Sequence, residues 1–197
     1  MTGLDPRLRR LIAAKIAASR ADWTGLATAI QETRLAGGNR ADLEETLLQG
    51  TLFYGFPRTV TAFESLQREW PTAVAPSGGG LPATEHAAAG ARLFAAIYGE
   101  NSASVLGMLR SFHADFADFV LEAAYGRVLA RPGLPPRERE LLAVGSLAAL
   151  EQIPQLVAHA RGAIGFGARL DEVQEAVTLA VGAGRAAELM RRIRPRA

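Results

Sequence analysis

The sequence contains no cysteine, and only one of its 22 basic residues, Lys15, is a lysine. The absence of cysteine excludes disulfide bonds, thiolate metal ligands and catalysis by a thiol. The three histidines are isolated from one another and from clustered carboxylates, so no metal site is predicted. The one glycine-rich segment lacks the context of a phosphate-binding loop. We therefore expect no cofactor.

The sequence also lacks a large excess of either positive or negative charge. The 22 basic residues face 20 acidic ones, for a formal net charge of +2, which does not predict nucleic-acid binding. Arg191, Arg192, Arg194 and Arg196 form one basic cluster, typical of a solvated helix end, with a polyanion-binding tail as the alternative. No segment approaches the ~18–20 continuous apolar residues of a membrane helix. Charges also interrupt the N-terminal segment, unlike a signal peptide. We expect a cytoplasmic protein without nucleic-acid or membrane partners.

The apolar residues, present at 49%, recur at spacings of three and four along most of the chain. This periodicity predicts an all-α fold, and no segment alternates with the period of two that is typical of a strand. Asp5 and Pro6 are typical of a helix start. The expected helices span about residues 8–16, 22–34, 42–53, 58–70, 83–98, 112–129, 137–150, 153–164, a segment from 170 and a closing one at 186–193.

Residues 71–82 form the one low-complexity stretch and are rich in proline and glycine. Such a stretch predicts a flexible linker or an exposed loop. We expect a single all-α domain over residues 1–197, with an N-terminal half at 1–70 and a C-terminal half at 83–197.

A faint internal repeat links the two halves. Gly37 is followed by an acidic helix start at Asp42, and Gly167 is followed by one at Glu172. The two glycines are separated along the chain by the same offset as the two acids, and we call this the repeat offset. The acids suit the positive end of a new helix. Duplication, or two helices that obey the same capping rules, would give this pattern.

Several segments together carry a family resemblance. In order they are Tyr125-Gly126, the turn Arg131-Pro132-Gly133-Leu134, the helix start Arg137-Glu138-Arg139, His159 with the later glycine turn at Gly167, and Glu172 with Glu175. This order resembles the carboxymuconolactone decarboxylase family. Leu48-Gln49 and Tyr54-Gly55-Phe56-Pro57 resemble a following helix of the same family. The resemblance covers about residues 35–70 and 90–183. Because the family pattern is here shared between two degenerate halves, it favours an ancient duplication.

The resemblance implies a multi-helix alkylhydroperoxidase-D-like bundle with a degenerate internal repeat, assembled as a homo-oligomer (trimer or hexamer). In the alkylhydroperoxidase D branch of the family, a glutamate, two cysteines and a histidine carry the chemistry. The corresponding positions here are Glu140, Gln152, Gln155 and His159. Because glutamine forms no thiolate, the chain is not predicted to be a thiol peroxidase.

The resemblance also identifies candidate site residues. His159 and Glu140 would be the catalytic pair, facing one another across a helical hairpin, with Glu140 orienting the imidazole. The alternatives are a core-edge histidine bonded to backbone and a glutamate in a solvated first turn. Arg139, Arg131 and Tyr125 are candidate substrate-binding residues, because arginine binds carboxylates in a bidentate manner. His86 and His113 are expected to be exposed.

The implied reaction is the cofactor-free removal of a carboxylate that is conjugated, through an alkene, to a lactone carbonyl. The lactone accepts the electrons, so the site must stabilise a dienolate and deliver a proton. We therefore expect a lyase acting on a small carboxylic acid or lactone. The alternative is a non-catalytic or unassigned oligomeric protein that retains the fold.

Overall fold

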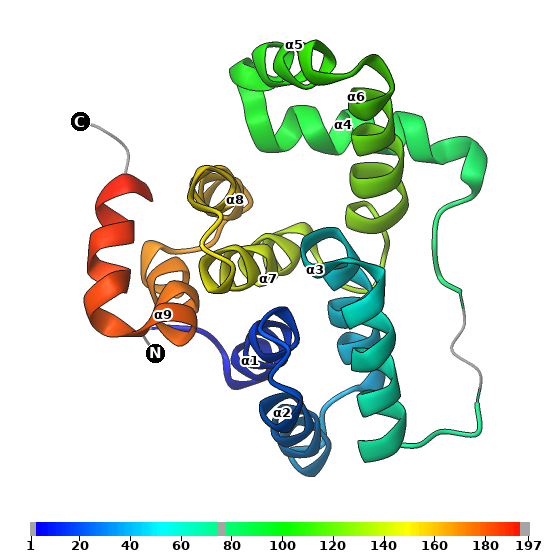
Figure 1. Ribbon diagram of the computed structural model, residues 1–197, viewed down its shortest axis with the longest axis vertical. Helices are drawn as coiled ribbons and strands as arrows, with labels where there is room; N and C mark the ends of the chain where they lie inside the picture. The colour runs from blue at the N-terminus through cyan, green and yellow to red at the C-terminus, as the bar shows by residue number, and fades with distance from the viewer. Residues whose placement is uncertain (1–2, 75–77, 194–197) are drawn as a thin grey trace. The chain divides into compact units, whose positions relative to one another are not determined.

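The computed structural model describes residues 3–74 and 78–193, and every regular element within them is a helix (Figure 1). The all-α prediction is confirmed. Contacts divide the chain into unit 1, Met1–Pro76 with Arg137–Ala197, and unit 2, Ser77–Pro136. The elements of unit 1 are α1 (Pro6–Ser19), α2 (Trp23–Leu35), α3 (Arg40–Glu69), α7 (Pro136–Ala149), α8 (Ile153–Gly165) and α9 (Leu170–Ile193).

The three helices α1, α2 and α3 are repeated by α7, α8 and α9. Each helix of the second set begins one repeat offset after the start of its counterpart. Ala21 and Glu151, which lie two residues after the ends of α1 and α7, both have positive φ (57° and 56°), although neither is glycine. A non-glycine residue in this region is uncommon, so its recurrence at the same offset favours duplication over shared capping rules alone.

Both third helices are interrupted by a glycine. Gly55 in α3 has φ 76° and ψ 172°, and Gly182 in α9 has φ 76° and ψ 164°. The sequence predicts separate helices on either side of Gly55 and before residue 186, and the structure has two helical segments that meet at a non-helical glycine in each place. Pro57 lies just after the first kink, where its ring does not clash with a preceding helical turn.

Four ion pairs in unit 1 repeat the same relation between the two copies. Within each copy, an arginine at the start of the first helix pairs with an acid at the start of the third helix. Between copies, the arginine two residues further along the chain pairs with an acid about one helical turn further along the third helix of the other copy. The pairs are Arg7–Asp42 and Arg137–Glu172 within copies, and Arg9–Glu175 and Arg139–Glu45 between them. This reciprocity is the pattern of two copies packed about an approximate two-fold axis.

The core of unit 1 lies where α1 meets α7. Ser19 Oγ and Ser146 Oγ share a hydrogen bond of 2.7 Å, and both side chains are buried. An added Cβ at Gly145 would lie 2.8 Å from Ile12 Cγ2, so the glycine permits a close approach of α1. Leu11 on α1 and Leu142 on α7 are fully buried, and burial of each side chain stabilises the fold by roughly 1.5–3 kcal/mol.

Unit 2 contains the 3₁₀ turns η1 (Ala83–Glu85) and η2 (Gly99–Asn101), the helices α4 (His86–Tyr98), α5 (Ser102–Phe112) and α6 (Ala114–Phe119), and the π-helix η3 (Val120–Leu129). The prediction of a single helix over 112–129 is wrong at its start. His113 has extended backbone (φ −166°, ψ 134°), caps α6 by accepting from the Asp115 N–H, and ends α5. The sequence did not indicate α5, in which no side chain is buried.

Two glycines bring α4 and η3 into backbone contact. A Cβ at Gly90 would lie 1.9 Å from the Leu121 carbonyl oxygen, and a Cβ at Gly126 would lie 2.0 Å from the His86 carbonyl oxygen. Neither contact partner is a flexible side chain, so neither can yield without moving a helix.

Replacing Gly90 with alanine is therefore expected to destabilise the protein by about 1–3 kcal/mol, because the added methyl group forces the two backbones apart. Gly107 in α5 is the matched control, because a Cβ there meets no atom within 4 Å. Its replacement with alanine is expected to be neutral or to stabilise by up to about 1 kcal/mol through helix propensity. Chemical denaturation measures both, and equal effects of the two substitutions would contradict the predicted backbone contact.

Candidate active site

Glu140 and His159 face one another across the hairpin formed by α7 and α8. The His159 Nδ1 lies 2.9 Å from the Glu140 Oε2. The glutamate is 2% exposed and the histidine 8% exposed. The hairpin turns at Glu151, whose positive φ directs α8 back along α7. The pairing proposed from the family spacing is thus present, in place of a solvated Glu140 or a histidine bonded only to backbone.

The contact determines what the imidazole can do. A carboxylate that accepts from the Nδ1–H fixes that tautomer, which leaves Nε2 as the nitrogen that would exchange a proton with a bound molecule. The same carboxylate stabilises the imidazolium when Nε2 is protonated. The equivalent positions of the first copy, one repeat offset earlier, hold Arg10 and Ala29. The pair therefore occurs in the second copy and not in the first.

The first copy contributes two side chains to the same cluster. The Phe53 ring on α3 meets the His159 imidazole edge-on, with ring centroids 6.1 Å apart. The Lys15 Nζ on α1 lies 4.5 Å from the centroid of the Phe53 ring. Phe53 is partly exposed, whereas Lys15 is fully buried. The cluster Lys15, Phe53, Glu140 and His159 therefore joins both copies of the repeat.

Lys15 is the residue that sequence reasoning missed. Its Nζ has no hydrogen-bond partner among the residues that the structure describes. Burial lowers the pKa of Lys15 well below its ordinary value of 10.5, the nearby Arg139 lowers it further, and Glu140 acts in the opposite direction. A signal was available in the sequence, because Lys15 falls within the apolar stripe of Leu8, Leu11 and Ile12 and is the sole lysine of the chain.

Replacing Lys15 with methionine is expected to raise the free energy of unfolding by about 1–3 kcal/mol at neutral pH, because it removes a buried donor without a hydrogen bond. Between the lowered pKa of folded Lys15 and its ordinary value of 10.5, the unfolded wild type binds more protons than the folded form. The stability of the wild type therefore rises with pH across this window.

Denaturation of the wild type and the Lys15→Met variant across this window measures the effect. The advantage of the variant is expected to shrink as the pH approaches 10.5. A wild type that is the more stable protein at every pH would instead show that Phe53 holds a charged Lys15 favourably.

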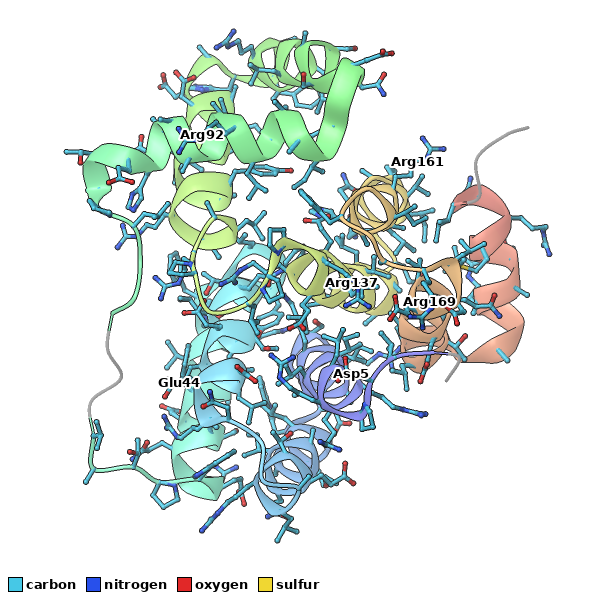
Figure 2. The ribbon with its side chains drawn as sticks, turned by 180° about the vertical axis from the view of Figure 1, so that it is seen from behind. Asp5, Glu44, Arg92, Arg137, Arg161 and Arg169 are labelled. Carbon is cyan, nitrogen blue, oxygen red and sulfur yellow. The ribbon has the colours of Figure 1, made fainter. Side chains whose placement is uncertain are left out.

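Arg139 and Arg137 hold helices together. Arg139 is 1% exposed, and its Nη2 lies 2.7 Å from the Glu45 Oε2. The Gln49 side chain donates to the Arg139 carbonyl oxygen at 2.8 Å. Arg137 forms an ion pair with Glu172 on α9, and Arg169 forms a second ion pair with the same glutamate. Both arginines are labelled in Figure 2. Arg139 thus lies next to the cluster, with its guanidinium in an ion pair with Glu45.

The other two candidate binding residues belong to unit 2. The Tyr125 hydroxyl donates to the Tyr98 hydroxyl at 3.1 Å. Arg131 lines a cavity of about 370 Å³, together with Gly78, Gly80, Leu81, Ala83, His86, Glu122 and Arg127. The structure therefore places Glu140, His159 and Arg139 in one unit and Arg131 and Tyr125 in the other.

The remaining histidines differ from each other. His113 is exposed, as predicted. The prediction for His86 is wrong: it is 8% exposed, and its Nε2 lies 2.9 Å from the Leu81 carbonyl oxygen, because the segment before α4 folds over the ring.

Across residues 3–74 and 78–193, no group of three or more His, Cys, Asp or Glu side chains is placed to hold a metal ion. The same part of the chain has no helix both long and apolar enough to cross a membrane. Arg194 and Arg196 of the basic tail lie outside the described residues.

Comparison with known proteins finds a family match over part of the chain and two similar proteins. Residues 114–194 match the carboxymuconolactone decarboxylase family. Peroxisomal protein 2 of Schizosaccharomyces pombe is 29% identical over 143 residues, which cover 71% of this chain and 67% of that protein. The 4-carboxymuconolactone decarboxylase of Acinetobacter baylyi is 36% identical over 69 residues, which cover 35% of this chain and 52% of that enzyme. With the all-helical fold and the family order of motifs, these matches place residues 114–194 of this cysteine-free chain in the carboxymuconolactone decarboxylase family.

Proposed function

We propose that the protein is a cofactor-free lyase that removes a carboxylate from a small lactone or a related acid, with His159 as the proton donor and Glu140 as the residue that orients it. The observation that carries the proposal is the buried contact of 2.9 Å between the His159 Nδ1 and the Glu140 Oε2. The similarity to a 4-carboxymuconolactone decarboxylase over 69 residues supports the substrate class. The lack of cysteine excludes the thiol chemistry of hydroperoxidases.

The proposed reaction breaks one carbon–carbon bond. The electron pair of the bond to the carboxylate moves through the alkene into the lactone carbonyl as CO₂ leaves, which gives a dienolate. The imidazolium of His159 then transfers the proton on Nε2 to carbon, and the Glu140 carboxylate holds the ring in the orientation that presents this nitrogen. Proton uptake from water restores the imidazolium.

The test is a decarboxylation assay with 4-carboxymuconolactone, followed by loss of the lactone absorbance. The wild type is expected to turn over, and the His159→Ala variant is expected to lose about 10²–10⁴-fold in kcat. Turnover that survives in the variant would remove His159 from the mechanism. A wild type inactive on this lactone and on related small acids would instead favour a protein that retains the fold without the chemistry.

A further inference from the structure

We propose that Lys15 is a nucleophile of the same site, whose Nζ forms an imine with the carbonyl group of a small oxo acid. The inference deepens the function proposed above by naming a second substrate class, 3-oxo carboxylates, whose decarboxylation an imine promotes. It rests on that function only for the position of the substrate beside His159.

The first support is the burial of an amine without a partner. Lys15 is fully buried, and its Nζ makes no hydrogen bond to any residue that the structure describes. Burial of a cationic group without a hydrogen-bonded counterion is costly, and a protein avoids that cost by keeping the amine neutral. A neutral amine has the free electron pair that attacks a carbonyl carbon, and desolvation and a neighbouring cation are the two ways in which lysine nucleophiles are activated. Lys15 is fully buried and Arg139 is the nearby cation, while Glu140 acts in the opposite direction, so burial is the main activating influence.

The second support is the choice of residue. Every other Lys or Arg position of the chain holds arginine, and the one lysine lies in the apolar stripe of α1. An arginine there would stay charged, whereas lysine can lose its proton and react. The equivalent position of the second copy is Gly145, so the duplicated helix α7 carries no second amine. The amine therefore belongs to the cluster in which Glu140 and His159 meet.

The third support is the position of Phe53. Its ring lies under the amine, forms a T-shaped contact with His159 and is itself partly exposed. In this proposal, rotation of this one partly exposed side chain uncovers the amine to a small molecule bound beside the imidazole. Because the amine is fully buried, the ligand has to be small.

The chemistry balances without a further reactant. The Nζ adds to the carbonyl carbon of the 3-oxo acid, and loss of one water gives a protonated imine. The electron pair of the bond to the carboxylate moves into the iminium as CO₂ leaves, which forms an enamine. The enamine carbon then takes a proton from the His159–Glu140 pair, and water releases the ketone and regenerates the amine.

Reductive trapping tests the proposal with acetoacetate as the probe and cyanoborohydride as the reductant of the imine. Because Lys15 is the only lysine, the amino terminus is the only other amine and serves as the internal reference. Peptide mass mapping is expected to find the adduct at residue 15 of the wild type and to lose it in Lys15→Met and Lys15→Arg. The Phe53→Ala variant is expected to trap faster by at least about tenfold, since the ring no longer covers the amine.

An adduct confined to the amino terminus in the wild type and in Phe53→Ala, with both proteins folded by circular dichroism, would overturn the proposal. The lactone assay reports on the proposed function separately. Lactone turnover without an adduct at Lys15 leaves that function standing and removes this inference. An adduct without lactone turnover supports this inference and contradicts the lactone as the substrate.

Discussion

The Glu140→Gln variant is expected to lower kcat for 4-carboxymuconolactone by about 10²-fold or more, with little change in the fold. Glutamine has the shape of glutamate and can still accept from the His159 Nδ1–H, but it no longer carries the charge that stabilises an imidazolium. If the two side chains act as a unit, the Glu140→Gln/His159→Ala double variant should be no slower than His159→Ala alone.

Glu151→Gln is the matched control, because Glu151 is an exposed glutamate at the end of the same hairpin. It is expected to leave kcat unchanged. Steady-state kinetics of the wild type and the four variants gives the result directly. Effects of Glu140→Gln and His159→Ala that simply multiply in the double variant would show that the glutamate does not act through the histidine.

The Glu45→Gln variant is expected to lose about 3–5 kcal/mol of stability, because it removes a negative charge that lies against the buried guanidinium of Arg139. The side chain of Arg139 is 2% exposed and that of Glu45 is 16% exposed. The repeat supplies a matched control in the equivalent pair, Arg9–Glu175, in which the arginine side chain is 58% exposed.

Glu175→Gln is expected to cost less than about 1 kcal/mol, because the exposed Arg9 is solvated when the pair is broken. In the wild type the Glu175 side chain also accepts a hydrogen bond from the Leu4 N–H, and glutamine retains an oxygen that can accept this bond. Urea denaturation of both variants measures the two losses. Similar losses would mean that burial does not distinguish the pairs, which would contradict the structural difference between them.

Much of the architecture could be predicted because it depends on local patterns. Helical periodicity and glycine turns located α2, α7 and α8 almost to the residue. The sequence already shows the repeat offset between Gly37 and Gly167, and in the structure the starts of three pairs of helices are separated by the same offset. By contrast, α5 was missed because it buries no side chain, and the break at His113 was missed because the phenylalanines on either side continue an apolar pattern. Apolar spacing alone did not distinguish one long helix from two helices that meet at a bend.

The site was only partly predictable, for a different reason. Glu140 and His159 are joined by a short hairpin, so their meeting follows from sequence distance and helix geometry. Lys15 and Phe53 come from α1 and α3, and their approach to His159 depends on how the two copies pack, which local periodicity does not contain. The same limit applies to Arg139, because its partner Glu45 lies in the other copy, far away along the chain.

The duplication in unit 1 also removes a dependence on concentration. A site assembled from two separate polypeptides dissociates on dilution, whereas two copies joined in one chain meet at an effective concentration set by the connection between them. Lys15 and Phe53 of the first copy are covalently tied to Glu140 and His159 of the second. Dilution below any subunit dissociation constant therefore leaves this cluster assembled, and the first copy remains free to keep arginine and alanine at positions 10 and 29.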